Sequence, residues 1–175
     1  MKPIACNICD FQPEYSIQEL VKFHGHLGPY IVLGYRMGRY ARAVFSGSRE
    51  ISAVVHCSDS PPESCLADGI QIGSGCTFGR RKIKLEKDER LGCIFHCGEE
   101  KIAIWGYKLR LPEISNGDYW ELIHRIAEAM YSASDDQLFA KDPDSSEFMH
   151  EFILVEERKP NSEEGLSFSS KNVQK

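Results

Sequence analysis

The chain has 175 residues, of which 42% are hydrophobic and 27% are charged, which is ordinary for one globular domain. Its formal net charge of −5 argues against a general nucleic-acid binder, because neutralising phosphates needs a surplus of lysine and arginine. No apolar run approaches the roughly 20 residues that cross a bilayer, and the first residues lack the long apolar stretch of a secretory signal. We therefore expect a cytoplasmic protein with reduced thiols and no membrane partner.

The first predicted helix begins after Ser16, which forms a capping box with Glu19. An apolar face follows in the sequence IQELV, so this helix should pack against a core. Gly25 should end the helix, because glycine is the residue that most readily leaves the helical conformation.

A second helix is predicted from Pro29, whose fixed backbone angle suits the first helical turn. This helix is long and apolar on more than one side, so we expect it to be central. Gly34 and Gly38 lie four residues apart on one face, where another element could approach closely. The β-branched residues that follow, over 51–57, predict a buried strand.

Ser60 and Glu63 suggest a second capping box, which predicts a helix from there to about Ile72. The remaining segments show either strand alternation or helical periodicity. We predict strands over 81–87, 92–97, 101–111 and 148–157. We also predict a helix over 118–133 that is capped by Asp118.

The later strands follow one another through short turns, so they should pair antiparallel. The order of elements predicts an α+β fold, with a mostly antiparallel sheet packed with N-terminal, central and C-terminal helices. We expect one domain over residues 1–157 and a loose polar tail over 158–175.

His24 and His26 flank Gly25 at the end of the first predicted helix. On a continuous helix their side chains would point about 200° apart and could not share a ligand. An irregular segment would let them converge, and glycine supplies that freedom. Alternatively, one histidine caps the helix and the other satisfies a buried carbonyl.

Seven cysteines in a reducing compartment do not indicate a disulfide framework, but metal ligands, reactive thiols or buried core residues. Cys65 lies in the third predicted helix, and Cys76 lies in the glycine-rich turn after it. Two imidazoles and two thiolates match a tetrahedral zinc site. We therefore expect a divalent metal, zinc, held by His24, His26, Cys65 and Cys76, provided that the turn carrying Cys76 folds back towards Cys65.

Other side chains have two interpretations each. Asp68 shares a helix face with Cys65, so it either orients a ligand histidine or lies in solvent. Cys57 ends the first predicted strand and is a reserve ligand. Cys6 and Cys9 form one CxxC, which is either a redox pair or an ordinary pair near the chain terminus.

The segments FHGHLGPYIVLGYRMGRYA and PPESCLADGIQIGSGCTFGRRKIKL together resemble the FmdE-like family, which takes its name from formylmethanofuran dehydrogenase. The resemblance spans roughly residues 15–155. It implies an α+β fold, a metal bound through the histidine and cysteine segments, and a homodimer.

The chain departs from the family pattern at three positions within these segments. Gly28 stands where a cysteine is usual, Tyr30 where a glycine is common, and Gly69 where an alanine is usual. The missing thiol at position 28 bears on the choice of metal and on any redox role there.

The sequence favours a metal-binding protein with an accessory or oxidoreductase-associated role, and it indicates neither a reaction nor a catalytic residue. Partners compatible with this role are a larger oxidoreductase complex and a small-molecule ligand. The alternative is a metal-free thiol/disulfide redox protein that cycles Cys65 and Cys76.

Overall fold

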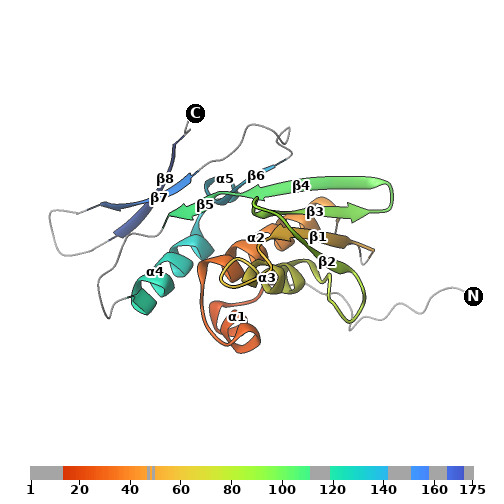
Figure 1. Cartoon of the computed structure of the whole chain (residues 1–175), viewed down its shortest axis with the longest axis horizontal. Coiled ribbons are helices and arrows are strands. Elements are labelled where there is room, and N and C mark those ends of the chain that lie inside the picture. Colours follow the sequence, from red (N-terminus) through yellow and green to blue (C-terminus); the bar gives the residue numbers. More distant parts are fainter. Residues whose placement is uncertain are drawn as a thin grey trace, which may run out of the picture.

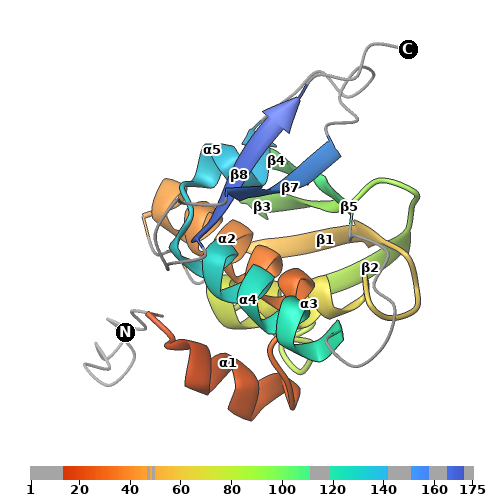
Figure 2. The same ribbon diagram turned by 90° about the vertical axis from the view of Figure 1, so that its left-hand side faces the viewer.

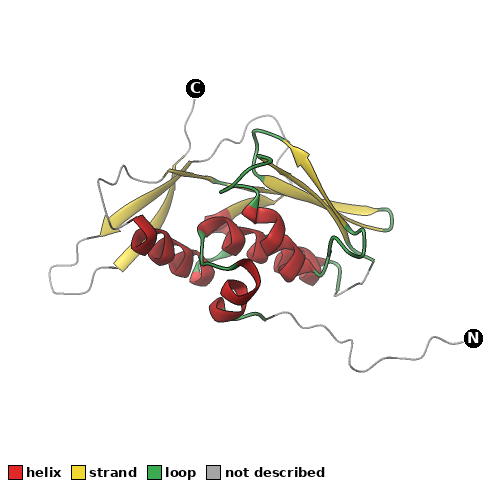
Figure 3. Ribbon diagram, turned by 60° about the horizontal axis from the view of Figure 1, so that its bottom comes forward, coloured by secondary structure: helices red, strands yellow, loops and turns green. Residues whose placement is uncertain are grey.

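The computed structural model describes residues 14–46, 48, 50–110, 119–141, 151–157 and 165–171. In chain order the elements are α1 (Ile17–His24), α2 (Pro29–Val44), β1 (Ser52–Cys57), α3 (Cys65–Ser74), β2 (Ile83–Lys87), β3 (Gly92–Cys97), β4 (Glu100–Gly106), β5 (Lys108–Arg110), α4 (Tyr119–Ser132), α5 (Asp135–Leu138), β6 (Phe139–Lys141), β7 (Glu151–Glu157) and β8 (Gly165–Lys171). Most of the helical mass lies to one side of the strands, with α1 farthest from them (Figures 1 and 3).

The strands form a five-stranded sheet of order β2-β1-β3-β4-β6 and a three-stranded sheet of order β5-β7-β8. The α+β fold is confirmed. Four of the six strand pairs described are antiparallel, whereas β1 pairs with β2, and β5 with β7, in parallel. The larger sheet is therefore mixed, because the chain leaves β1, passes through α3 and returns as β2, a crossover that makes neighbouring strands parallel.

The start of α1 agrees with its sequence signature. Ser16 Oγ accepts a hydrogen bond from the Glu19 N–H at 3.3 Å, and the Glu19 carboxylate accepts one from the Ser16 N–H at 2.7 Å. The helix ends at His24, and Pro29 opens α2, as predicted. The capping box thus fixes where α1 begins and, eight residues later, where its first histidine lies.

Helices α2 and α3 pack backbone to backbone, as Figure 2 shows from the side. A methyl group added at Gly38 would lie 2.7 Å from the Ser74 backbone nitrogen, and one added at Gly34 would collide with the Leu66 carbonyl oxygen. Gly69 on α3 meets α2 in the same way, at the Ile31 carbonyl oxygen. The prediction of a close approach at Gly34 and Gly38 is confirmed.

The predicted start of the third helix was wrong. Helix α3 begins at Cys65, and Glu63 accepts a hydrogen bond from the Ser58 N–H at 3.3 Å instead of completing a capping box. Two consecutive prolines explain the delay, because the residue before a proline is pushed out of the helical region. Ser60 and Pro61 both precede a proline, so the chain turns there before it becomes helical.

Two further predictions concern the C-terminal half of the chain: the polar tail over 158–175 and the helix cap at Asp118. Strand β8 lies inside the segment predicted as a polar tail and pairs antiparallel with β7. The sequence there alternates, with Leu166 and Phe168 separated by Ser167 and followed by Ser169, which is a strand signal. Asp118, predicted to cap α4, lies outside the described residues.

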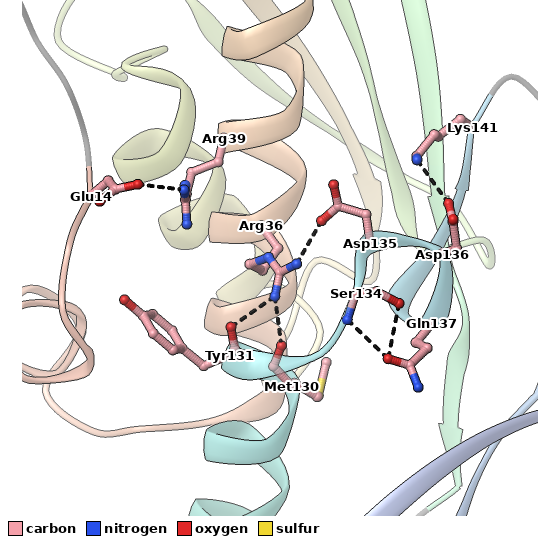
Figure 4. Close-up of polar contacts among 10 residues, drawn as sticks. All are labelled: Glu14, Arg36, Arg39, Met130, Tyr131, Ser134, Asp135, Asp136, Gln137 and Lys141. Atoms are coloured by element: carbon pink, nitrogen blue, oxygen red, sulfur yellow. Dashed lines mark hydrogen bonds and ion pairs between the residues drawn. The ribbon is translucent and has the colours of Figure 1, made fainter.

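Arg36 fastens the end of α4 to α2 (Figure 4). Its guanidinium donates to the carbonyl oxygens of Met130 at 3.2 Å and Tyr131 at 2.8 Å, and to the Asp135 carboxylate at 2.8 Å. These contacts satisfy carbonyls that have no partner within the last turn of a helix. They also fix where α4 lies, and α4 carries part of the site described below. Among the helices described, none is long and apolar enough to cross a membrane.

Candidate functional site

A pocket of about 300 Å³ opens where the end of α1 and the starts of α2, α3 and α4 meet. Three of its lining residues are metal-ligand candidates from the sequence: His24, His26 and Cys65. Most of the remaining lining is apolar or aromatic, and includes Tyr30, Pro61, Pro62, Tyr119, Trp120 and Ile123.

The two histidines converge because α1 ends between them. Gly25 has a left-handed backbone, with φ of 95°, and its N–H donates to the Val21 carbonyl at 2.7 Å. The ring centroids of His24 and His26 lie 4.5 Å apart. The predicted convergence is confirmed, and the cap at the end of α1 is made by the backbone of Gly25 rather than by a histidine.

His24 is oriented by Asp68. The His24 Nδ1–H donates to the Asp68 carboxylate at 2.8 Å, and the Gln71 amide donates to the same carboxylate at 3.3 Å. Of the two interpretations of Asp68, the structure supports orientation of a histidine. In the neutral ring, a proton on Nδ1 leaves the lone pair of His24 on Nε2. That atom is buried and has no hydrogen-bond partner among the described residues.

The other two donors differ in their protonation. Desolvation lowers the pKa of His26, and the nearby His24 and His124 lower it further, which favours the neutral form of the ring that binds metals. Burial raises the pKa of the Cys65 thiol, and the Asp68 carboxylate adds to this. Cys65 therefore keeps its proton unless a cation approaches, since metal coordination deprotonates a thiol.

These donors share a pocket without forming a finished coordination sphere. Within the described ranges, no three His, Cys, Asp or Glu side chains are grouped closely enough to hold a metal ion. The fit to a metal therefore rests on the type of donors and on the buried, unpartnered Nε2 of His24.

The structure does not bring Cys76 to this pocket. Cys76 is 1% exposed, and its thiol donates to the Ile51 carbonyl at 3.2 Å. Cys65 begins α3 and Cys76 follows its end, and a rise of ~1.5 Å per residue puts Cys65 and Ser74 about 14 Å apart. Cys76 is not among the lining residues of the pocket, so its position does not favour the returning turn that the four-ligand prediction required.

Cys57, the reserve ligand, lies at the end of β1 and is fully buried. Burial raises the pKa of its thiol to about 11, and the nearby Glu63, Asp59 and Cys65 contribute to this rise. It is therefore a protonated core thiol close to the pocket. Cys6 and Cys9 lie outside the described residues.

The aromatic wall was not predicted. Trp120 and Tyr119 are 61% and 45% exposed, and the ring of Trp120 lies 5.9 Å from that of His26. The sequence did contain a signal for this wall, because two large aromatic residues, Tyr119 and Trp120, begin an otherwise amphipathic helix. The sequence could not show that this helix end lies next to His26.

Comparison with known proteins places these features in a family. The family model described as "FmdE, Molybdenum formylmethanofuran dehydrogenase operon" matches residues 23–140. The chain belongs to the FmdE family. The matched residues contain both the histidine and the cysteine segments, so the resemblance seen in the sequence is confirmed. The operon named in the description is compatible with a larger complex.

This FmdE chain is also similar to a protein of Archaeoglobus fulgidus named "Probable S-adenosyl-L-methionine-binding protein". The two are 36% identical over an alignment of 70 residues, and the match covers 35% of this chain. The match covers 18% of the Archaeoglobus protein, so this chain spans less than a fifth of that relative.

Proposed function

We propose that this FmdE-family chain binds a divalent metal, zinc, through His24, His26 and Cys65, in a role associated with a larger oxidoreductase. The observation that carries the proposal is the buried Nε2 of His24, which has no partner among the described residues while Asp68 holds the opposite ring nitrogen. A histidine oriented by a carboxylate in this way is the usual arrangement at protein zinc sites.

The donor set suits zinc. Neutral imidazole nitrogens and a thiolate are its preferred ligands, and three protein ligands leave a fourth position open. Zinc supplies Lewis acidity at such a position. The chain's own residues would bind the ion, fix the tautomer of His24 and surround the open position with apolar side chains that limit access of water. The four-ligand site that includes Cys76 stays a prediction, one that the position of Cys76 does not favour.

Metal analysis of the full chain, purified without a histidine tag, tests the proposal. We expect close to one zinc per chain, and a loss of most of it in the double variant His26→Ala, Cys65→Ala. Cys97→Ser is a matched control, because Cys97 is another half-buried thiol that does not line the pocket. Absence of metal from the native chain, or equal metal in the double variant, would contradict the proposal.

The thiol/disulfide alternative ranks below the metal site. A disulfide needs its two Cα atoms within roughly 7 Å of each other, and the length of α3 separates Cys65 from the region of Cys76 by about twice that distance. Counting accessible thiols before and after mild oxidation tests it. Loss of two thiols without release of zinc would favour the redox role.

A homodimer and association with an oxidoreductase also remain proposals. Sedimentation analysis of the purified chain measures the first. For the second, a stoichiometric oxidoreductase that co-purifies with the chain from its native source is the expected result. A chain that sediments and purifies alone would exclude both.

The name of the Archaeoglobus protein makes S-adenosylmethionine a second candidate ligand for the same pocket. The observation that favours it is the aromatic lining from Tyr30, Tyr119 and Trp120, which suits an adenine ring and a sulfonium cation. Equilibrium dialysis with labelled S-adenosylmethionine is the test. Saturable binding that Trp120→Ala weakens would support this candidate, and absence of saturable binding would reject it.

A further inference from the structure

We propose that the pocket beside His24 and Cys65 binds a flat heteroaromatic molecule without a phosphate group, with its ring stacked on Trp120. This inference rests on the proposed function in one respect: both use the same pocket. Ring binding and metal binding are separate measurements, so either can fail alone.

Trp120 is presented for stacking by its neighbours. Its indole is 61% exposed, yet it is flanked by two rings, with centroids 5.6 Å away for Tyr119 and 5.9 Å away for His26, whose planes lie 75° and 80° from that of the indole. Large apolar side chains exposed at a concave surface are typical of an interaction site. Aromatic faces stack on flat ring systems whatever the substituents of the ring.

The other lining residues and the volume of the pocket narrow the class of ligand that it can bind. Pro29, Pro61 and Pro62 add rigid apolar surfaces from the start of α2 and from the turn before α3. The volume of about 300 Å³ is at the lower end of the range for small-molecule sites. One ring or two fused rings fit this space with room for a substituent, and a dinucleotide does not.

The polar groups of the pocket indicate which hydrogen-bonding groups and charges the ligand ring can carry. In the metal-free chain, with its proton on Nδ1, His24 offers Nε2 as a buried acceptor, so a ring N–H directed at it would find a partner. No lysine or arginine is among the described residues that line the pocket, so a phosphate would find no cationic side chain there. A nitrogen heterocycle satisfies both conditions.

The spacing of Trp120 and Ile123 on α4 supports the same class of ligand. Ile123 lines the pocket one turn after Trp120, and its side chain is 5% exposed. The first turn of α4 thus presents a buried aliphatic side chain and an exposed indole to the same space. Of these two side chains, the exposed indole is the one that a ligand ring can reach.

The probe for the experiment is 2-aminopurine, a fluorescent purine base that is quenched on stacking. It is titrated with the full chain, as purified and after removal of metal with a chelator. We expect saturable quenching, which Trp120→Ala weakens at least about fivefold and Trp120→Phe weakens less. Phe78→Ala is the matched control, because Phe78 is a 79% exposed aromatic side chain that does not line the pocket. It should leave binding unchanged.

Competitors test the chemical class. Adenine should displace the probe, cyclohexylamine should not, and adenosine monophosphate should compete more weakly than adenine because of its phosphate. Thermal unfolding of each variant confirms that it is folded, and Trp120 is exposed enough for truncation to be tolerated.

The inference is overturned if quenching does not saturate at millimolar chain, if Trp120→Ala binds as tightly as the native chain, or if cyclohexylamine competes as well as adenine. Zinc content is measured on the same samples. Ring binding by a chain that contains no metal as purified would reject the metal proposal and keep this one. One zinc per chain without ring binding would do the reverse.

Discussion

Asp68 on α3 accepts a hydrogen bond at 2.8 Å from Nδ1 of His24, the last residue of α1. The two residues are 44 positions apart in the chain, and their contact connects the histidine segment to the cysteine segment. The side chain of His24 is 8% exposed and that of Asp68 is 40% exposed, so the ring is shielded from solvent while water still reaches the carboxylate. It determines which ring nitrogen of His24 faces the pocket.

We predict that Asp68→Asn weakens zinc binding about 10- to 100-fold, because a neutral amide increases the basicity of His24 less than a carboxylate does and can turn its NH2 group towards the ring. Competition against a zinc-binding dye measures the change. Glu128→Gln on the exposed face of α4 is the control and should leave zinc affinity unaltered. Equal affinities in all three chains would show that Asp68 does not act on the site.

The glycine contact between α2 and α3 sets a second prediction. A methyl group at Gly69 would lie 2.6 Å from the Tyr35 backbone nitrogen and would collide with the Ile31 carbonyl. Gly69→Ala should therefore lower the free energy of unfolding by about 2 kcal/mol or more, since backbone atoms cannot move aside cheaply. Urea unfolding measures this loss. Gly79→Ala is matched, because a methyl group there meets nothing within 4 Å, and it should change stability little.

Arg36 and Arg39 lie three residues apart on α2 and make different ion pairs. The side chain of Arg36 is 13% exposed and bonds Asp135 and two carbonyls of α4, whereas that of Arg39 is 39% exposed and pairs with the exposed Glu14. Arg36→Met should cost about 2–4 kcal/mol of unfolding free energy, and Arg39→Met about 1 kcal/mol or less. Denaturant unfolding of both variants checks the difference. Similar losses would mean that Arg36 does not fasten α4.

The ionisation of Asp88 determines how we expect the stability of the fold to change in acid. Hydrogen bonds from Arg90 hold the pKa of Asp88 at about 2, below its ordinary value of 3.8, with a further contribution from His56. Because the folded-state pKa is the lower one, the ionised carboxylate stabilises the fold above about pH 4, and this stabilisation is lost as the pH falls through about 2.

Asp88→Asn should therefore be less stable than the native chain at neutral pH and should lose less stability between about pH 4 and about pH 2. Thermal unfolding as a function of pH measures both effects. Glu99→Gln, at an exposed turn position, is the control. If the unfolding temperatures of the native chain and Asp88→Asn fall by the same amount between about pH 4 and about pH 2, the low pKa assigned to Asp88 is wrong.

Local patterns predicted much of the fold. The capping box of Ser16 and Glu19, the helix end at Gly25 and the start of α2 at Pro29 depend on interactions within a few residues, and the structure has all three. The convergence of His24 and His26 followed from the same local argument. The parallel pairing of β1 and β2 was not predicted, because it depends on where the chain returns after α3.

The amino-acid sequence alone determined the family, the α+β class and the two histidines beside one another, because neighbouring residues and short motifs carry that information. Only the tertiary structure decided that Asp68 holds His24, that Trp120 faces His26 and that Cys76 lies in the core. Each of these contacts depends on how whole helices pack. The spacing of Gly34 and Gly38 indicated that some element approaches α2 closely, but only the fold shows that this element is α3. The long-range hydrogen bonds by which Arg36 holds α4 are not encoded in sequence periodicity.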